Sequence, residues 1–153
     1  MWISYPFIGL AERTPRRPHL VMHAFPLAVA SMCLVVIAED EPLLVEMLTE
    51  IFESEGLDVT AFATADDAWR HLQTAAQAPD LLFTDVRMPG AMDGLTLAKQ
   101  VMARWPTASI VVSSGNVSAA SELPKASFLP KPWSFGQLST LCRNVQALHQ
   151  RPV

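Results

Sequence analysis

The sequence predicts an α/β domain in which helices cover both faces of a doubly wound, five-stranded parallel sheet. Short apolar runs alternate along the chain with segments whose apolar residues recur at helical spacing. The first run, residues 33–38, is apolar throughout, which is typical of a parallel strand buried on both faces. Strands joined through helices pair in parallel by right-handed crossovers, so the alternation indicates a doubly wound sheet.

The first two expected strands flank a helix. The strand at 33–38 ends in acidic residues, and Pro42 then occupies a natural first helical position. Gly56 provides the C-terminal stop of this helix, and a short strand follows at 59–62. The apolar stripe of the helix consists of Leu44, Leu48, Ile51 and Phe52.

The middle of the chain contains two further helices and a strand. Residues 64–67 form a capping-box variant that opens the second helix. The third strand, 81–84, runs into Asp85, and a loop at 88–94 leads to a third helix that Pro106 closes. The apolar stripe of the third helix consists of Leu97, Ala98, Val101 and Met102.

The last part of the domain supplies two strands, at 110–113 and 126–129. Between them, residues 117–123 leave room for about one or two helical turns, and Pro124 discourages more. We therefore expect a shortened fourth helix. A capping box at 134–137 opens the final helix. Its core-facing stripe consists of Phe135, Leu138, Leu141, Cys142, Val145 and Leu148.

Composition and charge exclude several classes of function. Half of the 153 residues are hydrophobic, which is enough for one domain with a real core. Residues 1–31 hold three basic and one acidic residue, whereas residues 32–153 hold eight basic and 14 acidic residues. A domain this acidic is a poor candidate for phosphate contacts, so we expect no nucleic-acid partner. Two cysteines are too few for a disulfide scaffold.

The chain divides into a proline-containing leader at 1–31, expected to be poorly ordered, and a domain at 32–150. The uncharged run at 20–38 leaves a secretory signal or a membrane helix open as alternatives, and residues 28–30 resemble a signal-peptidase site. Against both alternatives, Pro26 interrupts the run, and its second half is accounted for as the first strand. We therefore expect a cytoplasmic protein without a membrane partner.

Polar residues follow four of the five expected strands. Ligands of open parallel sheets bind outside the carboxyl ends of the strands, so these residues should converge on one rim. Each residue alone has an ordinary explanation as a capping, turn or loop residue. Together they form a candidate site. The residues are Glu39, Asp40, Glu41, Asp85, Ser113, Ser114 and Lys131.

The donor types at this rim indicate a metal and phosphoryl site. Converging carboxylates repel each other unless a cation lies between them, and oxygen ligands without His or Cys favour Mg²⁺. A hydroxyl from Ser114 and the ammonium group of Lys131 would then complete a receptor for a phosphoryl group. Asp85 would be the nucleophile and would form an acyl phosphate.

Four motifs resemble those of response-regulator receiver domains, in the same order along the chain. They are Glu-Asp-Glu-Pro at 39–42, Phe-Thr-Asp-Val-Arg-Met-Pro at 83–89, Ser-Gly at 114–115 and Phe-Leu-Pro-Lys-Pro at 128–132. The resemblance covers residues 32–150 and is strongest to short stand-alone receivers. It implies a flavodoxin-like sheet with strand order 2-1-3-4-5.

The resemblance implies a phosphoacceptor and a metal site. Asp85 would accept the phosphoryl group. Asp40 and Asp85 would ligate Mg²⁺ directly together with the main-chain carbonyl of Arg87, and Glu39 would help to hold the metal through water. Lys131 would pair with the phosphoryl oxygens.

The resemblance also implies switch residues. Ser114 matches the family's Ser or Thr position better than Ser113 does, because a small residue follows it. Phe128 matches the aromatic switch position but lacks a hydroxyl, and the bond between Lys131 and Pro132 should be cis. The positions that tune phosphoryl lifetime correspond to Arg87 and Asn116.

Two departures from the family pattern concern the surface. The loop at 88–94 is one residue longer than the commonest receiver pattern. Ser114 and Lys131 are only 17 positions apart, which is short for the family and again implies a shortened fourth helix. That helix usually contributes to the output surface, so the usual signalling face is in question.

We expect a non-enzymatic receiver that a histidine kinase or phosphotransfer protein phosphorylates and that signals to a separate, unknown downstream protein. The chain ends soon after the last helix, so no output domain is expected. Two alternatives remain: a phosphorylation-independent adaptor, and an aspartyl-nucleophile phosphatase. The phosphatase is disfavoured because Arg87 stands where such enzymes place a second Asp. A flavodoxin-like cofactor protein is disfavoured because acidic residues follow the first strand.

The remaining candidate ligands receive ordinary interpretations. Cys33 and Cys142 are expected to be small core residues, because their neighbours are apolar. His71 and His149 have no partner at metal-ligand spacing in the sequence.

Overall fold

Five parallel strands form one sheet in the order β2-β1-β3-β4-β5, which confirms the expected fold class and strand order. The computed structural model describes residues 32–115, 123 and 125–150. In chain order, the elements are β1 (Leu34–Ala38), α1 (Pro42–Ser54), β2 (Asp58–Phe62), α2 (Ala65–Thr74), β3 (Leu81–Asp85), α3 (Gly94–Arg104), β4 (Ser109–Ser114), β5 (Ser127–Pro130) and α4 (Phe135–His149).

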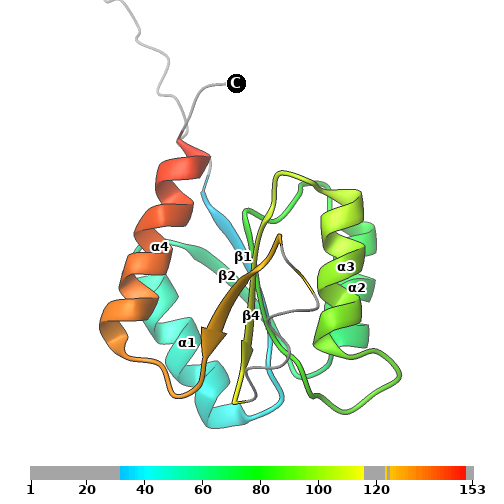
Figure 1. Ribbon diagram of the computed structural model, residues 1–153. Coiled ribbons are helices and arrows are strands. Elements are labelled where there is room, and N and C mark those ends of the chain that lie inside the picture. Colours follow the sequence, from blue (N-terminus) through cyan, green and yellow to red (C-terminus); the bar gives the residue numbers. More distant parts are fainter. Residues whose placement is uncertain (1–31, 116–122, 124, 151–153) are drawn as a thin grey trace, which may run out of the picture. The chain divides into compact units, whose positions relative to one another are not determined.

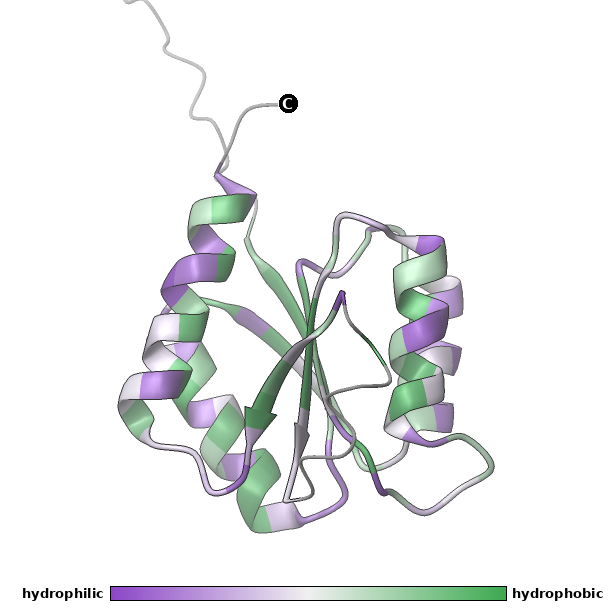
Figure 2. Ribbon diagram, viewed as in Figure 1, coloured by the Kyte–Doolittle hydropathy of each residue, from purple (hydrophilic) through white to green (hydrophobic). Residues whose placement is uncertain are grey.

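Helices cover both faces of the sheet (Figure 1), with α1 and α4 on one face and α2 and α3 on the other. Alternate strand residues point to opposite faces, so Val35 and Ile37 pack with α1 and α4, whereas Val36 and Ala38 pack with α2 and α3. Hydrophobic residues run along the central strands (Figure 2), as two-sided burial requires.

The helices begin where their sequences predict. Pro42 is at the start of α1, and Thr64 caps α2 by accepting a hydrogen bond from the third residue of the helix. Ser134 begins α4 with a complete capping box. Asp93 caps α3 in the same way as Thr64 caps α2. Gly56 follows α1 with a φ of 83°, a conformation that glycine adopts without strain.

The strand bounds differ from the expected ones by about one residue, as is common at element ends. The expected short helix at 117–123 falls, except for Leu123, outside the described residues, as do Asn116 and the leader at 1–31. Within the part of the chain that the structure describes, no helix combines the length and apolar character needed to cross a membrane.

Candidate functional site

The carboxyl ends of β1 and β3 bring three acidic side chains together. Oxygen atoms of Glu39, Asp40 and Asp85 all lie within 4.8 Å of one another. Glu39 and Asp40 directly follow β1, and Asp85 is the last residue of β3, the neighbouring strand. The Glu39 side chain is buried, whereas Asp40 is exposed. The convergence follows from parallel pairing, because equivalent strand ends meet at one edge.

Lys131 lies between two of these carboxylates. It follows β5 and reaches across the rim, so that its Nζ lies 2.7 Å from Glu39 Oε2 and 3.4 Å from Asp85 Oδ1. The second Glu39 oxygen, Oε1, accepts a hydrogen bond of 3.2 Å from the backbone N–H of Glu41. The buried Glu39 carboxylate therefore has a partner on each oxygen, as a charge in this position requires.

Burial and pairing act in opposite directions on this pair. Burial raises the pKa of the Glu39 carboxyl, although the hydrogen bond from Lys131 opposes the increase. Burial lowers the pKa of Lys131, but the hydrogen bond and charge of Glu39, together with Asp85, outweigh it and hold the pKa above its usual range. We expect Lys131 to remain a cation at neutral pH.

The three carboxylates fit a magnesium ion. The donor set is all oxygen, and three negative charges face the single positive charge of Lys131. Hard divalent cations take such ligands, whereas zinc and copper favour sets that contain nitrogen or sulfur. Arg87 lies two residues after Asp85 in the loop that leads to α3, with its side chain exposed.

The two serines at the end of β4 differ in their surroundings. Ser113 is fully buried and pairs with Asp85 in the register of β3 and β4. Its hydroxyl oxygen accepts a hydrogen bond of 2.6 Å from the indole N–H of Trp133. Ser114 is the last residue of β4, and its carbonyl accepts a hydrogen bond of 3.1 Å from the backbone N–H of Lys131. The chain around Lys131 is thus tied directly to the end of β4.

Aromatic side chains pack next to Lys131 and the end of β3. Trp133 meets Phe83 edge to face at a centroid distance of 5.7 Å, and the Lys131 ammonium group lies 5.5 Å from the Trp133 ring. Phe128 is half-buried in β5 and packs against the α2–α3 face of the sheet. The Lys131–Pro132 peptide bond, for which the resemblance implies the cis form, is cis.

Gly94, which the sequence did not indicate as a site residue, packs against the backbone of Asp85. A Cβ atom at Gly94 would overlap the carbonyl oxygen of Asp85 and would lie 2.7 Å from the Thr84 hydroxyl oxygen. The backbone N–H of Gly94 donates to the carbonyl of Val86 at 3.0 Å. The start of α3 therefore packs directly against the backbone that carries Asp85, and only glycine leaves the necessary space.

Asp66, in the first turn of α2, holds the loop between β3 and α3. Its Oδ2 atom accepts hydrogen bonds from the backbone N–H groups of Ala91, at 3.0 Å, and Met92, at 3.1 Å. Gly90 has a φ of 121°, and a Cβ atom there would overlap the same carboxylate oxygen. The longer loop noted in the sequence is therefore tied to α2. Nothing in the local sequence indicates this contact, because Asp66 and Ala91 are 25 positions apart.

Comparisons with known proteins show the family to which the chain belongs. The response regulator receiver domain family model matches residues 35–143. The chain belongs to this family. The matched range contains Glu39, Asp40, Asp85 and Lys131, and the match confirms the resemblance to the family.

Among curated proteins, the DNA-binding transcriptional regulator NtrC of Klebsiella pneumoniae is 31% identical over 69% of this chain and 23% of its own length. The NtrC of Salmonella typhimurium is 29% identical over 76% of this chain and 25% of its own length. A protein-glutamate methylesterase/protein-glutamine glutaminase of Symbiobacterium thermophilum is 36% identical over 52% of this chain and 22% of its own length. The chain spans about a quarter of the length of these relatives.

Solved structures show the same fold. A putative response regulator from Chloroflexus aurantiacus matches with a TM-score of 0.66 and 28% identity, covering 76% of this chain and 98% of its own. A CheY-like receiver domain protein from Methanospirillum hungatei matches with a TM-score of 0.69 and 18% identity, covering 78% of this chain and 98% of its own.

Proposed function

We propose that this receiver domain, over residues 32–150, accepts a phosphoryl group on Asp85 from a histidine kinase or a phosphotransfer protein. The observation that carries the proposal is the rim itself. In this chain, which belongs to the receiver family, the Asp85 carboxylate lies beside two further carboxylates and 3.4 Å from the Lys131 ammonium group. Asp85 is partly exposed, so a phosphodonor has access to it.

In the proposed reaction, one oxygen of Asp85 forms a bond to the phosphorus of a phosphohistidine. The phosphorus–nitrogen bond breaks, and its electron pair remains on the imidazole nitrogen, which leaves an acyl phosphate on Asp85. Lys131, which pairs with Glu39 and Asp85 before the reaction, offsets the charge of the phosphoryl oxygens.

Asp40 and Asp85, with the main-chain carbonyl of Arg87, would hold Mg²⁺ directly, and Glu39 would help to hold it through water; the three carboxylates lie close together. When bound, Mg²⁺ supplies positive charge that offsets the negative charge of the phosphoryl oxygens. The all-oxygen donor set supports this assignment.

The proposed output is a change in protein–protein contacts. The phosphoryl group brings about two negative charges and new acceptor oxygens to the rim. Ser114 is the last residue of β4, and Phe128 lies within β5, three residues before Lys131. Both side chains would shift the balance between two arrangements of these strands. Arg87 and Asn116 are the positions proposed to set the lifetime of the phosphoryl group.

Intact mass spectrometry after incubation with Mg²⁺ and acetyl phosphate tests the proposal. The chain should gain one phosphoryl group, and Asp85→Ala should abolish the gain. Asp58→Ala, which removes an exposed carboxylate from β2, is the matched control and should leave the gain intact. An unmodified chain, or an undiminished gain in Asp85→Ala, would contradict the assignment.

The choice between a phosphorylation switch and a phosphorylation-independent adaptor depends on the partner. A pull-down with and without acetyl phosphate should capture the downstream protein in a phosphorylation-dependent way, and Asp85→Ala should remove the dependence. Capture that is the same in all conditions would favour the adaptor.

A further inference from the structure

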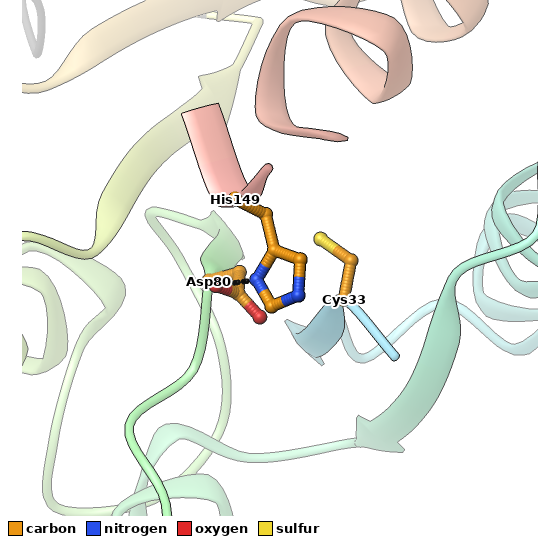
Figure 3. Close-up of side chains that lie close together, drawn as sticks. All are labelled: Cys33, Asp80 and His149. Atoms are coloured by element: carbon orange, nitrogen blue, oxygen red, sulfur yellow. Dashed lines mark hydrogen bonds and ion pairs between the residues drawn. The ribbon is translucent and has the colours of Figure 1, made fainter. Parts of the chain in front are cut away.

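A second cluster of side chains of metal-ligand type lies at the amino-terminal ends of the strands, whereas Asp85 lies at a carboxyl end. Cys33 immediately precedes β1, Asp80 immediately precedes β3, and His149 is the last residue of α4. The Cys33 sulfur, an Asp80 carboxylate oxygen and a His149 ring nitrogen all lie within 4.8 Å of one another (Figure 3). We propose that these three residues form a binding site for a zinc-like divalent cation.

The sheet fixes two of the three ligands. The backbone carbonyl of Cys33 accepts a hydrogen bond from Asp58 N–H at 2.9 Å, and Asp80 N–H donates to the Leu34 carbonyl at 2.8 Å. Asp80 Oδ2 in turn accepts from Leu34 N–H at 2.8 Å, and Oδ1 lies 2.7 Å from Nδ1 of His149. The carboxylate therefore has a fixed orientation, and the site is largely arranged before an ion binds.

The three side chains come from segments far apart in the sequence and differ in exposure. Cys33 is only 5% exposed, whereas the side chains of Asp80 and His149 are 25% and 20% exposed. An ion can therefore approach through the Asp80 and His149 side while the sulfur remains protected from solvent. Figure 3 shows the thiol and the carboxylate beside the same imidazole ring.

A cation at this site has to compete with a proton on Cys33. Burial, followed by the charge of Asp80, raises the pKa of the Cys33 thiol to about 12, so the thiol is protonated and unreactive at neutral pH. A divalent cation between the thiol and the carboxylate would favour the thiolate, because its two positive charges offset the negative charges of both ligands. Binding releases the thiol proton to solvent as the sulfur–metal bond forms.

The donor set selects the kind of ion. One thiolate, one imidazole and one carboxylate suit zinc, which takes sulfur, nitrogen and oxygen ligands in a four-coordinate arrangement. Mg²⁺ prefers oxygen ligands and should remain at the rim carboxylates. Three protein ligands leave one position for water. An ion here would join the end of α4 to the start of β1 and β3, so it should stabilise the fold.

The competing interpretation is an ion pair between Asp80 and His149 that holds α4 without a metal. Cys33 separates the two interpretations, since the ion pair does not need the thiol. Cys142 supplies a matched control, because it is also buried and belongs to no such cluster among the described residues.

The experiment uses the full chain with excess Mg²⁺, so that the rim carboxylates are saturated, and adds Co²⁺ as a spectroscopic probe. The wild type and Cys142→Ala should show thiolate-to-cobalt charge-transfer absorption at one ion per chain, and Zn²⁺ should displace the Co²⁺. Cys33→Ala should lose the absorption. His149→Ala should weaken binding by more than about tenfold, the loss that even an outer partner of a metal ligand produces.

Thermal unfolding provides a second readout, with circular dichroism to show that each variant is folded. Zn²⁺ should raise the Tm of the wild type and Cys142→Ala but not of Cys33→Ala. Absence of the charge-transfer absorption in the wild type, or its persistence in Cys33→Ala, would overturn the proposal. Asp85→Ala should bind Co²⁺ as the wild type does, so the result does not depend on the proposed phosphorylation.

Discussion

The Lys131 ammonium group pairs with two of the three rim carboxylates, Glu39 and Asp85. Its nearest partner is Glu39, at 2.7 Å, rather than the proposed phosphoacceptor Asp85, at 3.4 Å. Glu39 is 1% exposed, so its charge depends on this pairing and on the N–H of Glu41. Lys131 therefore stabilises the buried Glu39 carboxylate as well as contacting the position where a phosphoryl group would be added.

Replacement of Lys131 with methionine should lower the free energy of unfolding by about 1–3 kcal/mol at neutral pH, because a buried carboxylate loses its partner. The pKa of Lys131 is raised in the folded state, so its stabilising contribution is complete below the ordinary lysine pKa and is lost as the pH rises through the folded-state value. The difference between the wild type and Lys131→Met should therefore be largest near neutral pH and should shrink above about pH 10.4.

Urea unfolding of both proteins between about pH 8 and pH 11.5 measures this difference directly. Lys125→Met is the control, since Lys125 is exposed. A difference that stays constant across this range would contradict the assigned role of Lys131.

Gly94→Ala should lower the free energy of unfolding by about 1–3 kcal/mol or more, because the added methyl group overlaps the Asp85 carbonyl and forces the backbone to move. The same displacement should slow phosphorylation of Asp85. Gly136→Ala is a matched control in α4, where an added Cβ meets no atom within 4 Å. That change should be neutral or stabilising by up to about 1 kcal/mol, because alanine favours helix. Equal effects of the two substitutions would contradict this account.

The elements of the fold were predictable because their signals are local. The starts of α1, α2 and α4 are marked by Pro42, Thr64 and Ser134, each of which acts within one helical turn. Contacts between elements were not predictable in the same way. Asp66 and His149 have ordinary local surroundings in the sequence, and their partners are 25 or more residues away.

Asp66 links two elements, so its removal should loosen the loop between β3 and α3 without unfolding either helix. In Asp66→Ala, the amides of Ala91 and Met92 lose their acceptor and should exchange with deuterium faster than in the wild type. Phosphorylation of Asp85 should also slow, because this loop carries the carbonyl of Arg87.

Asp66→Asn is the control, because it keeps one acceptor oxygen, and it should retain most of the amide protection. Hydrogen exchange resolved to single amides, together with phosphorylation rates from intact mass, measures both effects. Unchanged exchange at Ala91 and Met92 in Asp66→Ala would contradict the link between α2 and the loop.

At the scale of the whole molecule, the topology explains why the candidate rim could be predicted. Parallel strands place their carboxyl ends at one edge, so acidic residues after β1 and β3 and a lysine after β5 had to converge. The same rule places the residues before β1 and β3 at the other edge. The sequence shows no partner for His149 at metal-ligand spacing, but the structure places Cys33 and Asp80 beside it, because these residues precede two neighbouring strands.

Residues 32–150 should fold and accept a phosphoryl group without the leader, because helices from 42–149 already cover both faces of the sheet. This range also contains Glu39, Asp40 and Asp85, and the group formed by Cys33, Asp80 and His149. A fragment of residues 32–150 should therefore match the full chain in its urea midpoint and in phosphorylation of Asp85. Side-by-side unfolding and intact-mass measurements check this expectation, with Asp85→Ala in the fragment as the negative control. A lower midpoint for the fragment would show that residues 1–31 contribute to the stability of the fold, and the proposed domain boundary would then have to move toward the N-terminus.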